Sequence, residues 1–168
     1  MRLELPYGKN ALENMRAGDE VIISGRMYVG RDQVHKRLVT CLDNPPFPFE
    51  GNAVYYMGPS PAPDGYVTGA AGPTTSARMD PYSPLLLEAG LRVMIGKGPR
   101  SAAVQEACIR FHGVYLYTYG GCGALYASCI KSSRIIAYPE LGPEALLELE
   151  VEDFPSICFY DAHGGRLI

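Results

Sequence analysis

Short apolar runs alternate with amphipathic segments through the second half of this chain, and this alternation restricts the fold more than any other feature. Residues 84–90 predict a helix that ends on a glycine, residues 91–95 a short apolar strand, and residues 101–112 a second helix. The remaining expected elements are a helix at 122–130 and strands at 114–118, 134–138 and 156–160. Strands separated by helices of this length are typical of a two-layer or three-layer α/β arrangement and not of an all-β fold.

The first half of the chain predicts fewer regular elements. Residues 10–13 have the form of a helix start, and residues 19–25 then predict a strand. Between residues 31 and 42 apolar residues recur at helical spacing, which predicts an amphipathic helix with His35 on its polar side. Three prolines make residues 44–51 a loop, because proline lacks a backbone N–H and fixes its φ angle. The other segments expected here are a short strand at 53–57 and a turn-rich loop at 59–65.

Composition limits the size of the domain and the classes of partner. With 168 residues, of which 47% are hydrophobic, the chain is long enough for one domain over residues 1–168 and short for two. A formal net charge of -3, with 20% charged residues, provides no basic field for nucleic acid and no polybasic segment for a membrane. The first residues lack the apolar core of a signal peptide and no apolar run could span a bilayer, so we expect a cytoplasmic protein.

Five cysteines are scattered along the chain without a CxxC pair: Cys41, Cys108, Cys122, Cys129 and Cys158. Structural zinc and iron–sulfur sites usually show short cysteine spacings, so this arrangement predicts no metal site in the chain. We expect free thiols, most of them buried as small hydrophobic residues, with metal ligation by a subset as the alternative.

Residues 72–79, Gly-Pro-Thr-Thr-Ser-Ala-Arg-Met, concentrate hydroxyl groups and a cation in one turn. Thr74, Thr75 and Ser76 are residue types that cap a helix by accepting hydrogen bonds from its first N–H groups. Such a helix would present free N–H donors and the positive end of its dipole to a carboxylate or phosphate. Arg78, one helical turn beyond Thr74, would add a guanidinium that can hold a carboxylate by two hydrogen bonds. The alternative is an ordinary capped helix with a surface arginine, and these residues alone leave both interpretations open.

Two further cations stand next to glycines. Arg31 follows Gly30 where a strand is expected to meet a helix, and Lys97 lies between two glycines where a strand ends. Glycine permits close approach of the backbone, so both side chains are candidates for an anion site. The alternatives are a helix-start arginine paired with Asp32 and a solvated loop lysine. We interpret His35 as a structural, hydrogen-bonded histidine and not as a base.

Six segments of the chain occur in the same order in one known family: 30–37, 72–79, 95–98, 140–145, 153–155 and 161–164. Over nearly its whole length the chain resembles the β subunit, or C-terminal domain, of class I iron–sulfur fumarate hydratases and L-tartrate dehydratases. Pro143 stands where the family commonly has methionine, and Cys122-Gly123 interrupts a stretch that is usually alanine-rich. These departures lie in other parts of the sequence than the three cation-bearing segments. We therefore expect them to affect the packing of the domain more than the chemistry of the site.

The resemblance implies an α/β fold of the swivelling β/β/α type, which closes over an α subunit that carries a [4Fe–4S] cluster. In the family reaction an open iron of that cluster acts as a Lewis acid on the substrate hydroxyl, while a base removes a proton from the adjacent carbon. By the resemblance, Thr74 is the candidate base, and the candidate substrate-binding residues are Arg31, Arg78, Lys97 and Thr75. A hetero-oligomer of the α2β2 type is expected, or a homodimer when the chain is isolated.

The implied activity is the reversible hydration of fumarate to malate by the assembled enzyme. Proton removal next to a carboxylate builds negative charge there, so surrounding cations stabilise the transition state more than the ground state. Two alternatives stay open from the sequence. The complex could act on L-tartrate or a methyl-substituted malate, or the chain could be a non-catalytic module that binds small dicarboxylates.

Overall fold

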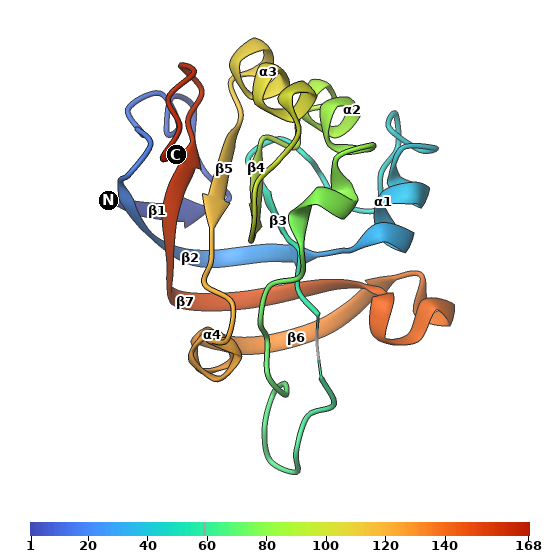
Figure 1. Cartoon of the computed structure of the whole chain (residues 1–168). Coiled ribbons are helices and arrows are strands. Elements are labelled where there is room, and N and C mark those ends of the chain that lie inside the picture. The colour runs from blue at the N-terminus through green and yellow to red at the C-terminus, as the bar shows by residue number, and fades with distance from the viewer. Residues whose placement is uncertain (59) are drawn as a thin grey trace.

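The computed structural model describes residues 1–58 and 60–168, and its main feature is a sheet that closes on itself (Figure 1). Neighbouring strands follow the order β1 (Arg2–Leu5), β2 (Glu20–Val29), β3 (Ala53–Tyr55), β4 (Val93–Gly96), β5 (Val114–Tyr117), β7 (Leu146–Tyr160) and β6 (Ile130–Ala137). Because β2 also pairs with β7, the strands β2, β3, β4, β5 and β7 form a closed ring. The strands β1 and β6 lie outside this ring, each paired on one side.

The parallel strands β3, β4 and β5 are short and apolar because both of their faces are buried. Alternate side chains point to opposite faces of a strand. On β4, Val93 and Ile95 join a cluster inside the ring, whereas Met94 joins a second cluster on the outer face. On β5, Leu116 faces inward and Tyr115 outward. The continuous apolar runs read from the sequence therefore reflect two separate cores.

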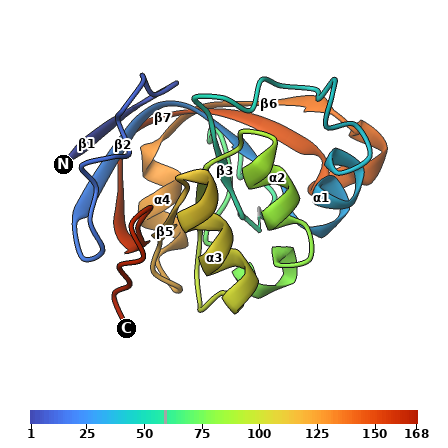
Figure 2. The same ribbon diagram turned by 90° about the horizontal axis from the view of Figure 1, so that it is seen from above.

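Helices cover the outer face of these parallel strands. The helices are α1 (Asp32–Leu38), α2 (Ser83–Glu88) and α3 (Ala102–Phe111), and the second core lies between them and the sheet. Seen from above, β2, β7 and β6 form an arc, with α2 and α3 on its inner side and α1 near one of its ends (Figure 2). The layers are thus β, β and α, a mixed α/β domain as the alternation predicted. A fourth helix, α4 (Gly123–Cys129), packs against β6 and β7.

The long strand β7 bends and takes part in both β layers. Its first half pairs with β2 and β6, and its second half pairs with β2 and β5. The register with β2 shifts between Ile23 and Gly25, where Gly25 has a φ of 107°. A side chain at Gly25 would collide with the carbonyl oxygen of Leu5 on β1, so only glycine fits this crossing point.

Most of the expected helices and strands are present. The helix start predicted at residues 10–13 is wrong, because residues 9–14 form turns and no helix. The helix expected over 31–42 ends at Leu38, and His35 lies on its buried side, contrary to the prediction of a polar side. The strand expected at 134–138 begins at Ile130, and β7 begins ten residues before the predicted 156–160.

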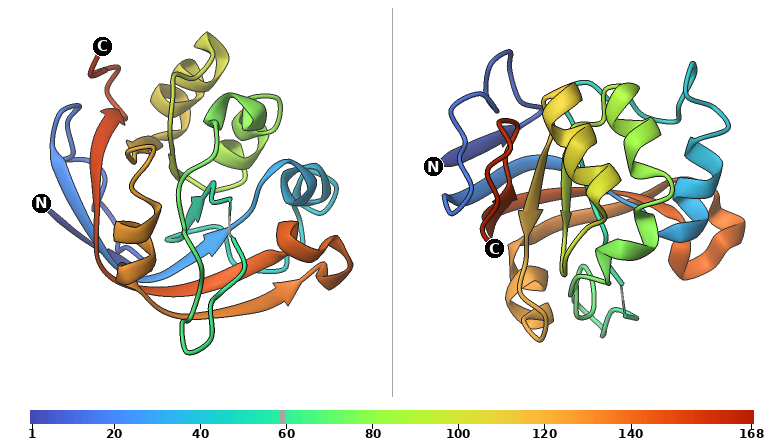
Figure 3. Two further views of the ribbon diagram at one scale, coloured as in Figure 1. Left: turned by 60° about the horizontal axis from the view of Figure 1, so that its bottom comes forward. Right: turned by 45° about the horizontal axis from the view of Figure 1, so that its top comes forward.

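A loop that precedes the Gly72–Met79 segment projects from the molecule. Residues 60–72 extend away from α2 and α3, on the side of the molecule where α4 lies (Figures 1 and 3). The loop expected at 59–65 is confirmed for residues 60–65, and Pro59 lies outside the described residues. Among the helices that the structure describes, none combines the length and hydropathy needed to cross a bilayer.

Candidate functional site

A cavity of about 520 Å³ lies where the parallel strands β3 and β4 end. Gly58 follows β3 and Lys97 follows β4, and both line it. The other lining residues are Ala70, Gly72, Pro73, Thr74, Thr75, Gly121, Gly123 and Ala124. In α/β sheets, ligands bind beyond the carboxyl ends of the strands. Five of the ten lining residues are glycine or proline, so backbone forms much of the wall.

Residues 72–75 reach this cavity as a backbone segment held by isolated β-bridges at Pro73 and Thr75. The N–H of Thr74 donates to the carbonyl of Tyr56 at 2.7 Å, and the N–H of Ser76 donates to the carbonyl of Lys97 at 2.9 Å. Thr75 and Lys97 form a parallel bridge. This pairing places Thr74 and Thr75 beside Lys97, residues that lie more than twenty positions apart in the sequence.

The predicted helix N-terminus is therefore wrong. Only a four-residue 3-10 helix, η1 (Ser76–Met79), follows, and Thr75 at its N-cap position makes no side-chain capping bond. The Thr74 and Ser76 N–H groups are already used by neighbouring strands. An anion in this cavity would meet hydroxyl groups and Lys97, without a helix dipole.

Arg31 lies at the rim of the same cavity, at the start of α1. Its Nη1 is 3.7 Å from the position that a Cβ on Gly58 would take, and its Nη2 is 3.5 Å from Oε1 of Glu144. The Nε atom is buried without a hydrogen-bond partner among the described residues. Glu144 neutralises part of the Arg31 charge, and Nη1 of the guanidinium lies beside Gly58.

His35 supports the backbone at Arg31 from inside the core. Its ring is fully buried, and Nδ1 lies 2.8 Å from the Arg31 carbonyl oxygen, to which it must donate because a carbonyl only accepts. Burial lowers the pKa of His35 to about 4, so the ring is neutral near pH 7. The prediction of a structural, hydrogen-bonded histidine is confirmed.

The two other predicted cations differ in position. Lys97 is half-buried, and its Nζ lies 3.6 Å from the position that a Cβ on Gly120 would take. Arg78 is exposed on η1 and is absent from the residues that line the cavity. Neither side chain forms an ion pair with any residue in the described parts of the chain. The structure thus brings Thr74, Thr75 and Lys97 together, with Arg31 at the rim and Arg78 outside.

A buried arginine that the sequence did not reveal holds the segment after this site. The Arg100 side chain is fully buried, with Nε 2.6 Å from Oδ1 of Asp80 and Nη2 2.7 Å from the hydroxyl of Ser83. Its guanidinium also lies over the rings of Tyr56 and Tyr115, at 5.2 and 5.0 Å. Asp80 directly follows η1, so this network fastens η1 to the loop after β4. The sequence holds no local signal that Arg100 is buried.

Residues 1–168 match the family model described as Fumarase C-terminus. The chain belongs to this family. The resemblance stated from the sequence motifs is therefore confirmed, and the observed mixed α/β fold agrees with a fumarase C-terminal domain.

Curated relatives of this fumarase C-terminal chain include whole enzymes and one subunit. It is 42% identical to the aerobic class I fumarate hydratase of Escherichia coli (strain K12) over 148 residues, 85% of this chain and 27% of the relative. It is 38% identical to fumarate hydratase 2 of Leishmania major over 164 residues, 95% of this chain and 29% of the relative. It is 30% identical to the L(+)-tartrate dehydratase subunit beta of Escherichia coli (strain K12) over 171 residues, 99% of this chain and 85% of the relative. The chain thus spans less than a third of these hydratases and most of the dehydratase subunit.

The five cysteines of this family member are free thiols. Cys108, Cys129 and Cys158 are buried, as expected for most of them. Burial raises the pKa of both Cys108 and Cys158 to about 12, so these thiols stay protonated, whereas metal ligands are thiolates. Within residues 1–58 and 60–168, no group of three or more His, Cys, Asp or Glu side chains is placed to hold a metal.

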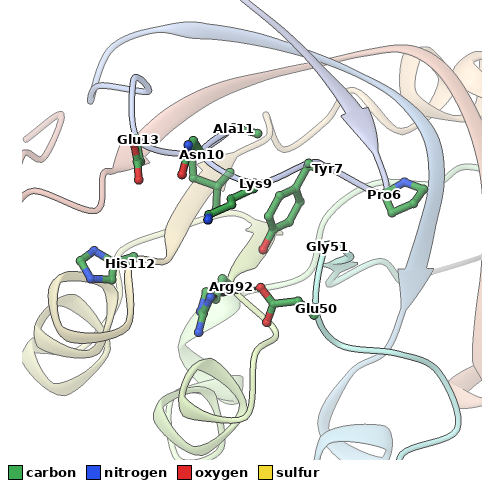
Figure 4. A pocket seen from close by; sticks show the side chains of 12 residues that line it. Pro6, Tyr7, Lys9, Asn10, Ala11, Glu13, Glu50, Gly51, Arg92 and His112 are labelled. Carbon is green, nitrogen blue, oxygen red and sulfur yellow. Dashed lines mark hydrogen bonds and ion pairs between the residues drawn. The ribbon is translucent and has the colours of Figure 1, made fainter.

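A second cavity, of about 450 Å³, lies at the opposite ends of the strands (Figure 4). Arg92 precedes β4 and His112 precedes β5, and Tyr7 points its hydroxyl toward Arg92 and Glu50. Arg92 Nη1 lies 3.2 Å from Oε1 of Glu50, so its charge is balanced. The Tyr7 hydroxyl and Arg92 Nε lack hydrogen-bond partners in the described parts of the chain, but both atoms are closed to solvent, so a ligand in the cavity cannot reach them. No residue of the predicted site lies here.

Proposed function

We propose that this chain is the β subunit of a two-component iron–sulfur hydro-lyase that reversibly hydrates fumarate to malate in the cytoplasm. The family and the relatives support hydratase chemistry, and 85% coverage of a dehydratase beta subunit supports a separate chain that acts with a partner. The observation that carries the proposal is the convergence of Thr74, Thr75 and Lys97 on one cavity, with Arg31 at its rim. Residues 1–168 would act as one swivelling domain in an assembly of the α2β2 type.

The proposed reaction requires one base and several hydrogen-bond donors from this chain. In the dehydration direction, a partner carboxylate would take the Thr74 hydroxyl proton, and the resulting alkoxide removes a proton from the carbon next to a substrate carboxylate. The electron pair of that C–H bond forms the alkene while the C–O bond breaks, and the leaving hydroxide becomes water by taking the proton that the partner carboxylate holds. Negative charge grows on the adjacent carboxylate, where Lys97 and Arg31 stabilise it. A threonine hydroxyl is a weak base, so this role requires nearby cations or a partner carboxylate, and Lys97 is the nearest cation in this cavity.

Arg78 takes part in this proposal only if the substrate is held between two chains. Its guanidinium is exposed and outside the cavity lining, so a dicarboxylate seated deep in the cavity would not meet it. A substrate held at the cavity mouth by a docked partner could accept two hydrogen bonds from Arg78. We assign the [4Fe–4S] cluster to the α subunit, as the family resemblance implies, and the burial that keeps Cys108 and Cys158 protonated supports this assignment.

L-tartrate dehydration is the second candidate function. Of the three relatives named above, the L(+)-tartrate dehydratase subunit beta is the one that this chain covers most completely. Tartrate and malate share two carboxylates and differ in one hydroxyl, and the cations of this site address carboxylates. Thr75 is the lining residue whose hydroxyl could distinguish them.

Anaerobic coexpression with a candidate α subunit tests the proposal. The complex is assayed with fumarate, malate and tartrate, and turnover of fumarate and malate above tartrate is expected. A wild-type complex that turns over none of the three would refute the proposed function. Tartrate as the best substrate would select the second candidate.

Thr74→Val tests the base within that complex. We expect turnover to fall at least about a hundredfold while a dicarboxylate still binds, measured by calorimetry, because the cations remain. Thr74 caps no helix, so the melting temperature should change little. The matched control is Thr40→Val, an exposed threonine at the end of α1, which should keep near-normal turnover. Near-normal turnover in Thr74→Val would remove this residue from catalysis.

A further inference from the structure

We propose that the hydroxyl of Tyr115 is a positioning group that fixes the Thr74–Thr75 segment against the Lys97–Gly98 loop. Its effect on turnover rests on the proposed function, whereas its effect on local structure does not. Tyr115 lies on β5, outside the cavity, and contacts neither the cavity nor the predicted site residues directly. It would act through the two segments that carry them.

One phenolic oxygen joins both segments. Tyr115 Oη lies 2.8 Å from the hydroxyl oxygen of Ser76 and 2.8 Å from the carbonyl oxygen of Gly98. The carbonyl can only accept, so the single phenolic proton goes to Gly98 and the Ser76 hydroxyl donates to the phenol oxygen. The Ser76 N–H also donates to the carbonyl of Lys97 at 2.9 Å. Ser76 and the Lys97–Gly98 loop are therefore joined by two routes.

The Tyr115 ring is rigidly held, which makes its hydroxyl a fixed reference point. The residue is fully buried, with the Arg100 guanidinium 5.0 Å from its ring centroid on one side and Tyr160 at 5.5 Å. Burial raises the pKa of Tyr115 well above its usual value, so the proton donated to Gly98 is retained at physiological pH. Side chains locked by packing and carried on a strand position a site more accurately than loops do.

Close packing beneath Ser76 leaves its hydroxyl few alternatives. A side chain on Gly96, the last residue of β4, would collide with Ser76 Oγ and with the Tyr56 ring. The Ser76 residue is fully buried, and its hydroxyl has no route to water. Losing the Tyr115 hydroxyl would thus leave the Ser76 O–H and the Gly98 carbonyl without this partner, which weakens the local structure.

The consequence for chemistry follows from the chain positions. Thr74 lies two residues before Ser76, and Lys97 directly precedes Gly98. The distance between Thr74 and Lys97 therefore depends on the contacts of one hydroxyl together with the bond from the Ser76 N–H to the Lys97 carbonyl. A misplacement of about 1 Å can cost a hundredfold in rate, mostly where reacting groups must align in the transition state. We expect kcat to be affected more than KM.

Tyr115→Phe isolates this hydroxyl, because phenylalanine keeps the ring that packs against Arg100 and Tyr160. The matched control is Tyr160→Phe on the paired strand β7, whose hydroxyl accepts a bond from the backbone N–H of Arg100, two residues beyond Gly98, at 3.1 Å and bonds to neither Ser76 nor Gly98. In the free chain, hydrogen exchange of the Ser76 amide should accelerate at least about tenfold in Tyr115→Phe and stay near wild type in the control. In the assembled complex, kcat should fall about tenfold or more with KM within about threefold.

Ser76→Ala removes the other half of the contact and tests the coupling. If the two hydroxyls act together, Tyr115→Phe combined with Ser76→Ala should be no worse in kcat than the more impaired single variant. Additive losses, unchanged Ser76 exchange in Tyr115→Phe, or an equal effect of Tyr160→Phe would overturn the proposal. Should Tyr115→Phe fail to fold, Ser76→Ala alone must show the faster exchange of the Lys97-bonded amide. A wild-type complex without turnover would refute the proposed function, and the exchange measurements would still decide the role of Tyr115.

Discussion

Acidification is expected to destabilise this protein through the burial of His35. The ring is buried against Tyr56, with centroids 5.3 Å apart, and Nδ1 donates to the Arg31 carbonyl. Burial lowers the pKa of His35 to about 4, and the charge of Arg100 acts in the same direction. In the unfolded chain the imidazole has its ordinary pKa of about 6.5.

The sign follows from proton counting. Between pH 6.5 and pH 4 the unfolded chain binds a proton that the folded chain refuses, so the free energy of unfolding falls as the pH falls. Each pH unit between the two values costs up to about 1.4 kcal/mol, which gives about 3 kcal/mol in total. Above about pH 6.5 this contribution is complete and independent of pH. For a domain of marginal stability, about 3 kcal/mol is a large fraction of the whole.

Urea denaturation of the free chain at several pH values between 4.5 and 7.5 measures this slope. His35→Gln removes the titrating group, while the glutamine amide can still donate a hydrogen bond. The free energy of unfolding of this variant should be lower than that of the wild type at pH 7.5 but nearly independent of pH over this range. The control is His163→Gln at an exposed position, which should keep the wild-type slope. Asp161, whose pKa is held below its ordinary 3.8 by backbone N–H donors against the effect of burial, loses its contribution only below this range. Equal slopes in wild type and His35→Gln would refute the reasoning.

Two further predictions concern arginines in opposite surroundings. Arg100→Met should lower the free energy of unfolding by roughly 3 to 5 kcal/mol in chemical denaturation, because it leaves Asp80 without its buried partner. A loss below about 1 kcal/mol would show that water replaces the guanidinium. Arg78→Lys, at an exposed site, should leave the stability of the free chain unchanged but reduce kcat/KM of the complex at least about tenfold, because an ammonium cannot form a two-pronged carboxylate contact. Unchanged kinetics would make Arg78 a surface residue only.

The regular elements of the second half could be predicted because their signals are local. The runs that became β4 and β5 are apolar at every position since both faces are buried, and α3 shows a helical period with Ser101 accepting the N–H of Val104 as its cap. The strand β7 was largely missed although residues 147–150 alternate Leu and Glu. Its partners β2, β5 and β6 are distant in the sequence, and only pairing with them makes the segment a strand.

In the candidate site, too, some features could be predicted from local sequence and others depended on distant partners. The motifs around Arg31, Thr74 and Lys97 identified the family and the residues, because the order of side chains along a chain is a property of the sequence. Their backbone was predicted wrongly: Thr74, Thr75 and Ser76 are good helix-capping types, but their segment pairs with Tyr56 and Lys97 instead. Local propensity amounts to about 1 kcal/mol at a cap, which several hydrogen bonds to neighbouring strands outweigh.

What the sequence alone determined is therefore the family, the alternation of helix and strand, and the residue types that address a dicarboxylate. Only the tertiary structure decided that His35 and Arg100 are buried, that Arg78 stays outside the cavity, and that Thr74 stands beside Lys97. The physical reason is that burial and pairing depend on which distant segments meet when the sheet closes between β2 and β7. A polar residue carries no local mark of whether that closure leaves it in water or covers it.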